Sequence, residues 1–186
     1  MSNGSELPSE RRVALGLAIA WALALAAVVL VVARYDALPD PLPMFRSLTG
    51  DRAIARHKTP LVALRVPLIG IVQLVFITAL ALVARSAAAP GWLRLFLGTA
   101  LAIGAKAIFE AGELLLLGTD ASLLIVLARA GAVLSVVALA VFATILWRRG
   151  ALRRDRFPLG NARPRWLTPV AVACLAAYVF LVAASL

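Results

Sequence analysis

Long apolar runs alternate with short polar segments along the whole chain. A run of about 20 apolar residues is long enough for an α-helix that crosses the hydrocarbon core of a bilayer. Such segments must be helical, because a helix satisfies its own backbone hydrogen bonds in lipid. We therefore expect an all-α polytopic membrane protein, a bundle of about five transmembrane helices in a single domain. The helices are expected at about 13–33, 60–84, 92–118, 121–147 and 166–186.

The first apolar run could also be a signal peptide, because Arg11 and Arg12 precede it and Val31-Val32-Ala33 faintly resembles a cleavage site. Its apolar part has about 21 residues, whereas the core of a signal peptide usually has about 7–15. We interpret it as an uncleaved signal anchor. Composition supports a membrane location, because 63% of the 186 residues are hydrophobic, against about 45–50% in soluble domains.

The net charge of +10 is concentrated in the polar segments between the runs. Cytoplasmic segments of membrane proteins are enriched in Lys and Arg. In a five-helix bundle, the amino-terminal tail, the segment around Arg85 and the segment 148–165 share one side and together carry ten Arg. The segment 34–59 on the other side carries five Arg or Lys. We therefore expect the N-terminus in the cytoplasm and the C-terminus outside.

The cytoplasmic segment 148–165 carries seven Arg and one acidic residue, Asp155. Clustered basic residues beside a transmembrane helix attract anionic lipid headgroups. Docking of a cytosolic regulator is an alternative, whereas nucleic acid is not expected, because no aromatic residues interleave the charges. The residues expected to contact anionic lipids are Arg148, Arg149, Arg153, Arg154 and Arg156.

The external loop 34–59 contains three prolines within five residues, followed by a turn at Gly50-Asp51. Proline favours a stiff, extended path, and a loop of this length that is rich in turn formers is usually ordered or functional. We expect either a rigid connector on the outer surface or a binding loop.

The motif in this loop resembles that of the SdpI-like bacterial multipass membrane proteins, some of which confer immunity to a secreted toxic peptide or take part in signalling. The residues that carry the resemblance are Tyr35, Leu38, Pro39, Asp40, Leu42, Pro43, Gly50 and Lys58. Three positions depart from the family pattern: Phe45, Ser47 and Ala53 stand where His, Asn or Gly, and Asp are usual. The resemblance implies a location in the bacterial inner membrane and recognition of an external peptide.

Ionisable residues inside the expected helices form a second candidate site. Charged residues in a transmembrane helix are costly and usually functional. The charge cluster consists of Arg65, Gln73, Lys106, Glu110, Glu113 and Arg129. Depths counted at about 1.5 Å per residue place these groups in the outer half of the bilayer and predict the pairs Arg65–Glu113 and Arg129–Glu110.

The charge cluster carries three cations and two carboxylates, so one cation is in excess. Lys106 could be deprotonated, could share a carboxylate, or an anionic group of a ligand or lipid could complete the site. The cluster itself has three interpretations: a structural network of ion pairs, a pocket for a ligand or peptide, or a pathway for protons or ions. The last is disfavoured, because no acidic residue or His continues it toward the cytoplasm.

The sequence contains none of the usual signatures of catalysis, such as a phosphate-binding Gly-rich loop or a nucleophile elbow. With one His and one Cys in the chain, we expect no metal site, no cofactor and no enzyme activity. The first hypothesis is a receptor-like or immunity-type protein that recognises an external peptide or lipid. The alternatives are a structural subunit with membrane-protein partners, and a small transporter coupled to protons or ions.

Overall fold

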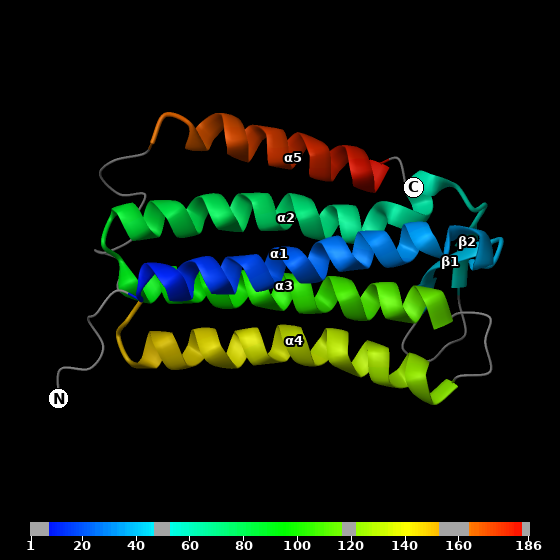
Figure 1. The fold of residues 1–186 in the computed structure, drawn as a ribbon, viewed down its shortest axis with the longest axis horizontal. Helices are drawn as coiled ribbons and strands as arrows, with labels where there is room; N and C mark the ends of the chain where they lie inside the picture. Colours follow the sequence, from blue (N-terminus) through cyan, green and yellow to red (C-terminus); the bar gives the residue numbers. More distant parts are fainter. Residues whose placement is uncertain (1–7, 47–52, 117–121, 153–163, 184–186) are drawn as a thin grey trace.

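A computed structural model describes residues 8–46, 53–116, 122–152 and 164–183. Within these ranges the chain forms five α-helices that run side by side (Figure 1). They are α1 (Glu10–Ala33), α2 (Pro60–Ser86), α3 (Pro90–Leu116), α4 (Ser122–Arg148) and α5 (Leu167–Ala183). The all-α bundle of about five helices predicted from the sequence is confirmed.

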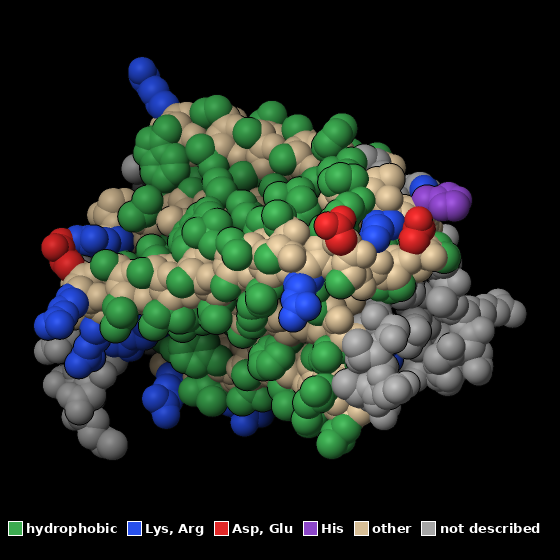
Figure 2. All heavy atoms as spheres, turned by 45° about the vertical axis from the view of Figure 1, so that its right-hand side comes forward, with side chains coloured by type: hydrophobic (Ala, Val, Ile, Leu, Met, Phe, Trp, Pro, Cys, Tyr) green, Lys and Arg blue, Asp and Glu red, His purple; other side chains and the backbone are tan. Residues whose placement is uncertain are grey.

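The lengths of the helices suit a bilayer. Four described helices, α1 to α4, are long and apolar enough to cross a membrane. The fifth, α5, has 17 residues, or about 25 Å at the usual rise, which is near the lower limit for a transmembrane helix. Hydrophobic side chains cover most of the face seen in Figure 2, and several charged side chains gather at its left-hand end while a few lie between the ends. The chain is therefore an integral, multipass membrane protein.

Three helices form the centre of the bundle. Helices α1, α2 and α3 pack against one another, while α4 packs mainly on α3 and α5 mainly on α2 (Figure 1). Small side chains allow the central helices to approach closely: Ala20, Ala24 and Ala27 of α1 are fully buried, and Gly104 of α3 lies against the backbone of Ala20. Close contact through small residues is the usual way in which helices associate in lipid.

The two ends of the bundle differ in chemistry. We call the end that carries residues 34–46 and 53–59 the loop end, and the opposite end, where α1 begins and α4 finishes, the arginine end. At the arginine end, Arg85 of α2 forms an ion pair with Glu10 of α1. Halfway along the same two helices, the indole Nε1 of Trp21 donates a hydrogen bond to the Oγ1 of Thr78, at 3.2 Å.

The segment at the loop end is folded. A short 3₁₀ turn (Tyr35–Ala37) follows α1, and strands β1 (Leu42–Arg46) and β2 (Ala53–Arg56) pair antiparallel. The register is irregular between Pro43 and Phe45, and the Asp40–Pro41 peptide bond is cis. The prolines predicted a stiff, extended path, but the sequence did not predict that this path would pair with a second strand.

Candidate functional site

Three residues of the motif in the external loop, Tyr35, Leu38 and Asp40, meet around a fourth, Lys58. Its Nζ donates hydrogen bonds to the carbonyl oxygens of Leu38, at 3.0 Å, and Asp36, at 3.3 Å. The same Nζ lies 5.3 Å from the centroid of the Tyr35 ring. The backbone N–H of Lys58 donates to the Oδ1 of Asp40, at 2.9 Å. We call these five residues the Lys58 clasp, since together they join the start of the loop to its end.

The Lys58 clasp is anchored in the apolar interior of the bundle. Leu38 and Leu42 are 4% and 1% exposed, and they pack against Ala63 of α2 and Ala107 and Ala111 of α3. Burying a leucine contributes about 1.5–3 kcal/mol. The described residues at the start of the loop are therefore fixed on the helices through Leu38 and Leu42.

Besides Leu42, which packs on α2 and α3, three residues of the motif lie outside the Lys58 clasp. Pro39 is half-buried between Leu38 and Asp40. Pro43 lies in β1, where its register partner is Ala55 of β2. The remaining motif residue, Gly50, lies outside the described residues.

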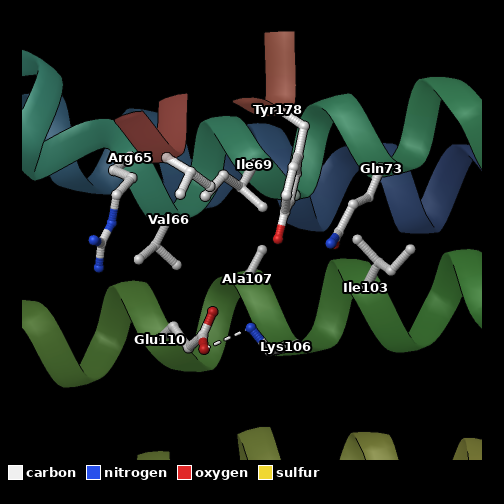
Figure 3. A pocket seen from close by; sticks show the side chains of 11 residues that line it. Arg65, Val66, Ile69, Gln73, Ile103, Lys106, Ala107, Glu110 and Tyr178 are labelled. Atoms are coloured by element: carbon white, nitrogen blue, oxygen red, sulfur yellow. Dashed lines mark hydrogen bonds and ion pairs between the residues drawn. The ribbon is translucent and has the colours of Figure 1, made fainter. Parts of the chain in front are cut away.

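The charge cluster is divided between two faces of α3. On one face, the Nζ of Lys106 lies 2.6 Å from the Oε1 of Glu110. On the other, the Nε of Arg129 in α4 lies 2.6 Å from the Oε1 of Glu113. Arg65 of α2 extends toward the Glu110 side of α3 (Figure 3), where the carboxylate of Glu110 attracts it.

The pairing of Arg129 with Glu110 predicted from depth is therefore wrong, and the direction of helical side chains explains the difference. Side chains in a helix lean toward its N-terminus. Helix α4 begins at the loop end, so the Arg129 guanidinium lies nearer that end than its Cα and meets Glu113, not Glu110. Glu110 leans back along α3 and meets Lys106 one turn earlier. The carboxylate of Glu110 also attracts the Arg65 guanidinium.

A cavity of about 340 Å³ lies between α2, α3 and α5, in the half of the bundle nearer the loop end. We call it the polar cavity. Arg65, Gln73, Lys106 and Glu110 of the charge cluster line it, and their polar groups point into the space between α2 and α3 (Figure 3). Four of the six predicted residues thus share one cavity, while Glu113 and Arg129 lie between α3 and α4.

Sequence reasoning missed the contribution of α5. The ring of Tyr178 crosses the polar cavity with its hydroxyl toward α3 (Figure 3), and Val182 also lines the wall. A signal was present: Tyr178 is the one tyrosine inside an apolar run, and a phenol in an apolar segment usually finds a polar partner. In the structure its side chain stays partly accessible, with 41% of the residue exposed. Nothing in the sequence pattern indicated that α5 would pack beside α2.

A second cavity of about 370 Å³ continues from the first toward the arginine end, between α2 and α5. We call it the apolar cavity. Gln73 and Tyr178 line both cavities. The rest of its wall is apolar: Val72, Phe76, Ala171, Cys174 and Leu175. The single cysteine, Cys174, is therefore half-buried at a cavity wall.

Of the arginines expected to contact lipid, Arg148 and Arg149 are exposed at the arginine end, while Arg153, Arg154 and Arg156 lie outside the described residues. In the part of the chain that the structure describes, no three His, Cys, Asp or Glu side chains lie close enough to hold a metal ion. Comparisons with protein-family models, curated proteins and solved structures gave no match. The resemblance to the SdpI-like proteins therefore stays a prediction.

Proposed function

We propose that the chain is a receptor-like or immunity-type protein of the bacterial inner membrane that recognises a peptide or lipid and catalyses no reaction. One observation carries the proposal: polar side chains from three helices converge on an open cavity between α2, α3 and α5 of the membrane-spanning bundle. Cavities of about 300–1,000 Å³ with a few convergent polar groups are typical of ligand sites. Ionisable side chains in a transmembrane bundle cost free energy to bury, and those that are present usually belong to a functional site.

The loop end is proposed to face the outside of the cell. The distribution of Lys and Arg supports this orientation by the positive-inside rule. With this orientation the Lys58 clasp forms an ordered outer surface, and the polar cavity lies in the outer leaflet beneath it. A ligand arriving from outside meets both. Fusing a reporter enzyme that is active only outside the cytoplasm to the carboxyl terminus tests the orientation, and an inactive fusion would contradict it.

The residues support recognition better than ion transport. A proton or ion path needs polar or titratable groups across the whole membrane. Beyond the level of Lys106, the expected spans carry no Asp, Glu or His on the way to the arginine end, apart from Glu10 at the first residue of α1. The charge cluster therefore fits a binding site in the half of the bundle nearer the loop end better than a path across the membrane.

The test is survival of a bacterial host exposed to culture medium from bacteria that secrete membrane-active toxic peptides. Hosts that express the wild-type protein are expected to survive better than hosts without it. Lys106→Gln and Glu110→Gln, which alter the polar cavity, are expected to remove the protection. The matched control is the double variant Glu113→Gln/Arg129→Gln, which removes one anion and one cation from the other face of α3.

Accumulation of each variant in the membrane is measured by immunoblot. Equal protection by the wild-type protein and by both cavity variants, at equal amounts of protein, would overturn the proposal. Loss of protection in the control alone would indicate that the charges stabilise the bundle and do not bind a ligand.

A further inference from the structure

Two uncharged polar side chains, Gln73 of α2 and Tyr178 of α5, lie where the polar cavity and the apolar cavity meet, since both line both cavities. The hydroxyl of Tyr178 is directed toward α3, and the amide of Gln73 is directed into the space between α2 and α3 (Figure 3). Both residues are exposed. Within the described ranges, no hydrogen bond joins either side chain to another residue.

The depth of these two groups in the bilayer makes unmet hydrogen bonds costly. Gln73 is the central residue of α2 (Pro60–Ser86), so it lies about 20 Å from either end of the helix at the usual rise per residue. That level is near the middle of a hydrocarbon core about 30 Å thick. An amide or hydroxyl group in such a medium costs free energy unless it forms a hydrogen bond. We therefore expect a bound molecule to supply the missing partners.

Other polar side chains in the same part of the bundle already have partners. The Oγ1 of Thr99 in α3 donates a hydrogen bond to the carbonyl oxygen of Leu95, at 2.9 Å. The Nζ of Lys106 lies 2.6 Å from the Oε1 of Glu110 and forms an ion pair with it. The contrast marks the two shared side chains as the groups in the described helices that are available to a ligand.

The depth of the shared side chains favours a ligand whose polar group is uncharged. A charged or zwitterionic headgroup is very costly to bring to the middle of a bilayer, whereas a hydroxyl or carbonyl group costs much less. An amide and a phenol can each donate a hydrogen bond and accept one. They therefore suit a hydroxyl group, which accepts from one and donates to the other, or a carbonyl group, which accepts from both.

The apolar cavity decides between a lipid and a peptide. A peptide inserted there would bury backbone N–H and C=O groups, each of which is costly to leave without a hydrogen bond. Among the residues that line the apolar cavity, only Gln73 and Tyr178 carry an amide or hydroxyl group in their side chains. A hydrocarbon chain needs no such partners. The apolar cavity therefore suits the chain of a lipid.

We propose that the two cavities bind an uncharged amphiphile, with a hydroxyl or carbonyl head bonded to Gln73 and Tyr178 and one hydrocarbon chain in the apolar cavity. The cavity volumes, about 340 and 370 Å³, lie within the range of ligand-binding cavities. This inference rests on the function proposed above, and it names the ligand class of the same site. Such a ligand reaches the site sideways through the bilayer.

The test measures binding of tritiated hexadecanol and tritiated methyl pentadecyl ketone to the full chain, purified in a neutral detergent, by scintillation proximity. The competitors are hexadecane, which lacks a head, and hexadecylphosphocholine, which has a zwitterionic head on the same chain. We expect the alcohol or the ketone to bind at least about tenfold more tightly than either competitor, a difference of about 1.4 kcal/mol. Tighter binding of the alcohol would identify a hydroxyl head, and tighter binding of the ketone a carbonyl head. Either result supports the proposal.

Two variants separate a ligand-binding role of the shared side chains from a structural one. Gln73→Leu and Tyr178→Phe each remove one polar group and are expected to weaken binding of the alcohol and the ketone roughly fivefold, as the loss of one hydrogen bond does. Their free energies of unfolding, measured in mixed micelles with sodium dodecyl sulfate, are expected to stay equal or rise, because a costly polar group leaves the hydrocarbon. The control is Thr99→Val, which removes a hydroxyl bonded within its own helix and should leave binding unchanged.

The hydrocarbon chain is tested separately. Ala171→Phe fills the apolar cavity and is expected to weaken binding of hexadecanol, whereas Ala173→Phe, on the exposed side of the same helix, is expected to have no effect. If Ala171→Phe does not fold, the wild-type protein tests the same point through its only cysteine, Cys174, which lines the apolar cavity. Bound hexadecanol is expected to slow alkylation of Cys174 by N-ethylmaleimide, and it should not slow alkylation in the double variant Cys174→Ala/Ala173→Cys.

Four results would each overturn the proposal. They are binding of hexadecane or of hexadecylphosphocholine as tight as that of the alcohol and the ketone, unchanged binding in both Gln73→Leu and Tyr178→Phe, a loss of stability in both variants, and a wild-type dimer that Gln73→Leu converts to monomers. The last result would show that the amide bonds to a second copy of the chain.

The inference and the proposed function fail separately. If the alcohol and the ketone do not bind while Lys106→Gln and Glu110→Gln still lose protection against the toxic peptides, only the inference about the ligand fails. If they bind as expected and Lys106→Gln and Glu110→Gln still protect, only the proposed function fails.

Discussion

Gly104 is a position in the middle of α3 where a single added methyl group is expected to damage the packing of two helices. A Cβ atom at residue 104 would lie 2.6 Å from the carbonyl oxygen of Ala20 and 3.1 Å from its Cα. These are backbone atoms of α1, so they cannot move away by a change of rotamer. Gly104→Ala therefore requires α1 and α3 to separate along a tightly packed seam.

A matched control is available in the same helix. A Cβ at Gly112 would meet no atom within 4 Å. Replacing Gly by Ala in a helix usually stabilises it by roughly 0.5–1 kcal/mol, and this gain is common to both variants. The cost of overpacking is typically about 1–3 kcal/mol and falls on Gly104→Ala alone. We therefore expect Gly104→Ala to be about 1–3 kcal/mol less stable than Gly112→Ala.

The free energy of unfolding is measured by titrating the purified protein with sodium dodecyl sulfate in mixed micelles. The fluorescence of the four tryptophans and the helical circular dichroism signal report unfolding. Equal stabilities of the two variants would refute the close approach of α1 and α3 at Ala20. A Gly104→Ala protein that is more stable than the wild type would contradict it more strongly, because it would show that space for the methyl group exists.

Three further predictions concern polar contacts. Glu113→Gln leaves Arg129 without its carboxylate and is expected to lower the stability of the bundle by about 2 kcal/mol; in the same titration, the double variant with Arg129→Gln should recover part of this loss. The Oγ1 of Thr59 caps α2 by accepting a hydrogen bond from a backbone N–H of the first turn. Thr59→Ala removes this cap and should lower the free energy of unfolding by about 1 kcal/mol, while Thr59→Ser should lower it less. Lys58→Met removes two hydrogen bonds to loop carbonyls and should increase amide hydrogen exchange in residues 35–42. Unchanged protection of these amides would show that the Lys58 clasp does not hold the loop.

The helices were predictable because the bilayer imposes one strong requirement, a long apolar segment. Hydropathy therefore located α1 to α4 and also α5, although α5 is shorter than the others. Hydropathy says little about which helices are neighbours, because lipid-facing and helix-facing positions are both apolar. For this reason the sequence indicated neither the packing of α5 on α2 nor the place of Tyr178 in the polar cavity.

The charge cluster was predictable as a set but not as pairs. Counting residues gives the depth of a Cα atom, whereas an ion pair depends on where the end of a long side chain lies. Arg129 reaches Glu113 because its side chain leans toward the loop end, a shift that a residue count ignores. In the external loop, the positions of Asp40 and Lys58 gave no sign of their contact, since it depends on how the intervening strands pair.

Two direct contacts between α1 and α2, and a third contact within the segment that joins them, have a mechanical consequence. The Glu10–Arg85 ion pair, the Trp21–Thr78 hydrogen bond and the Lys58 clasp prevent the two helices from sliding past one another. In a thicker or thinner bilayer the pair responds to hydrophobic mismatch by tilting as one body. Helix α5, which is the shortest and packs mainly on α2, has more freedom to tilt alone. Membrane thickness is therefore expected to change the width of the polar cavity through its α5 wall.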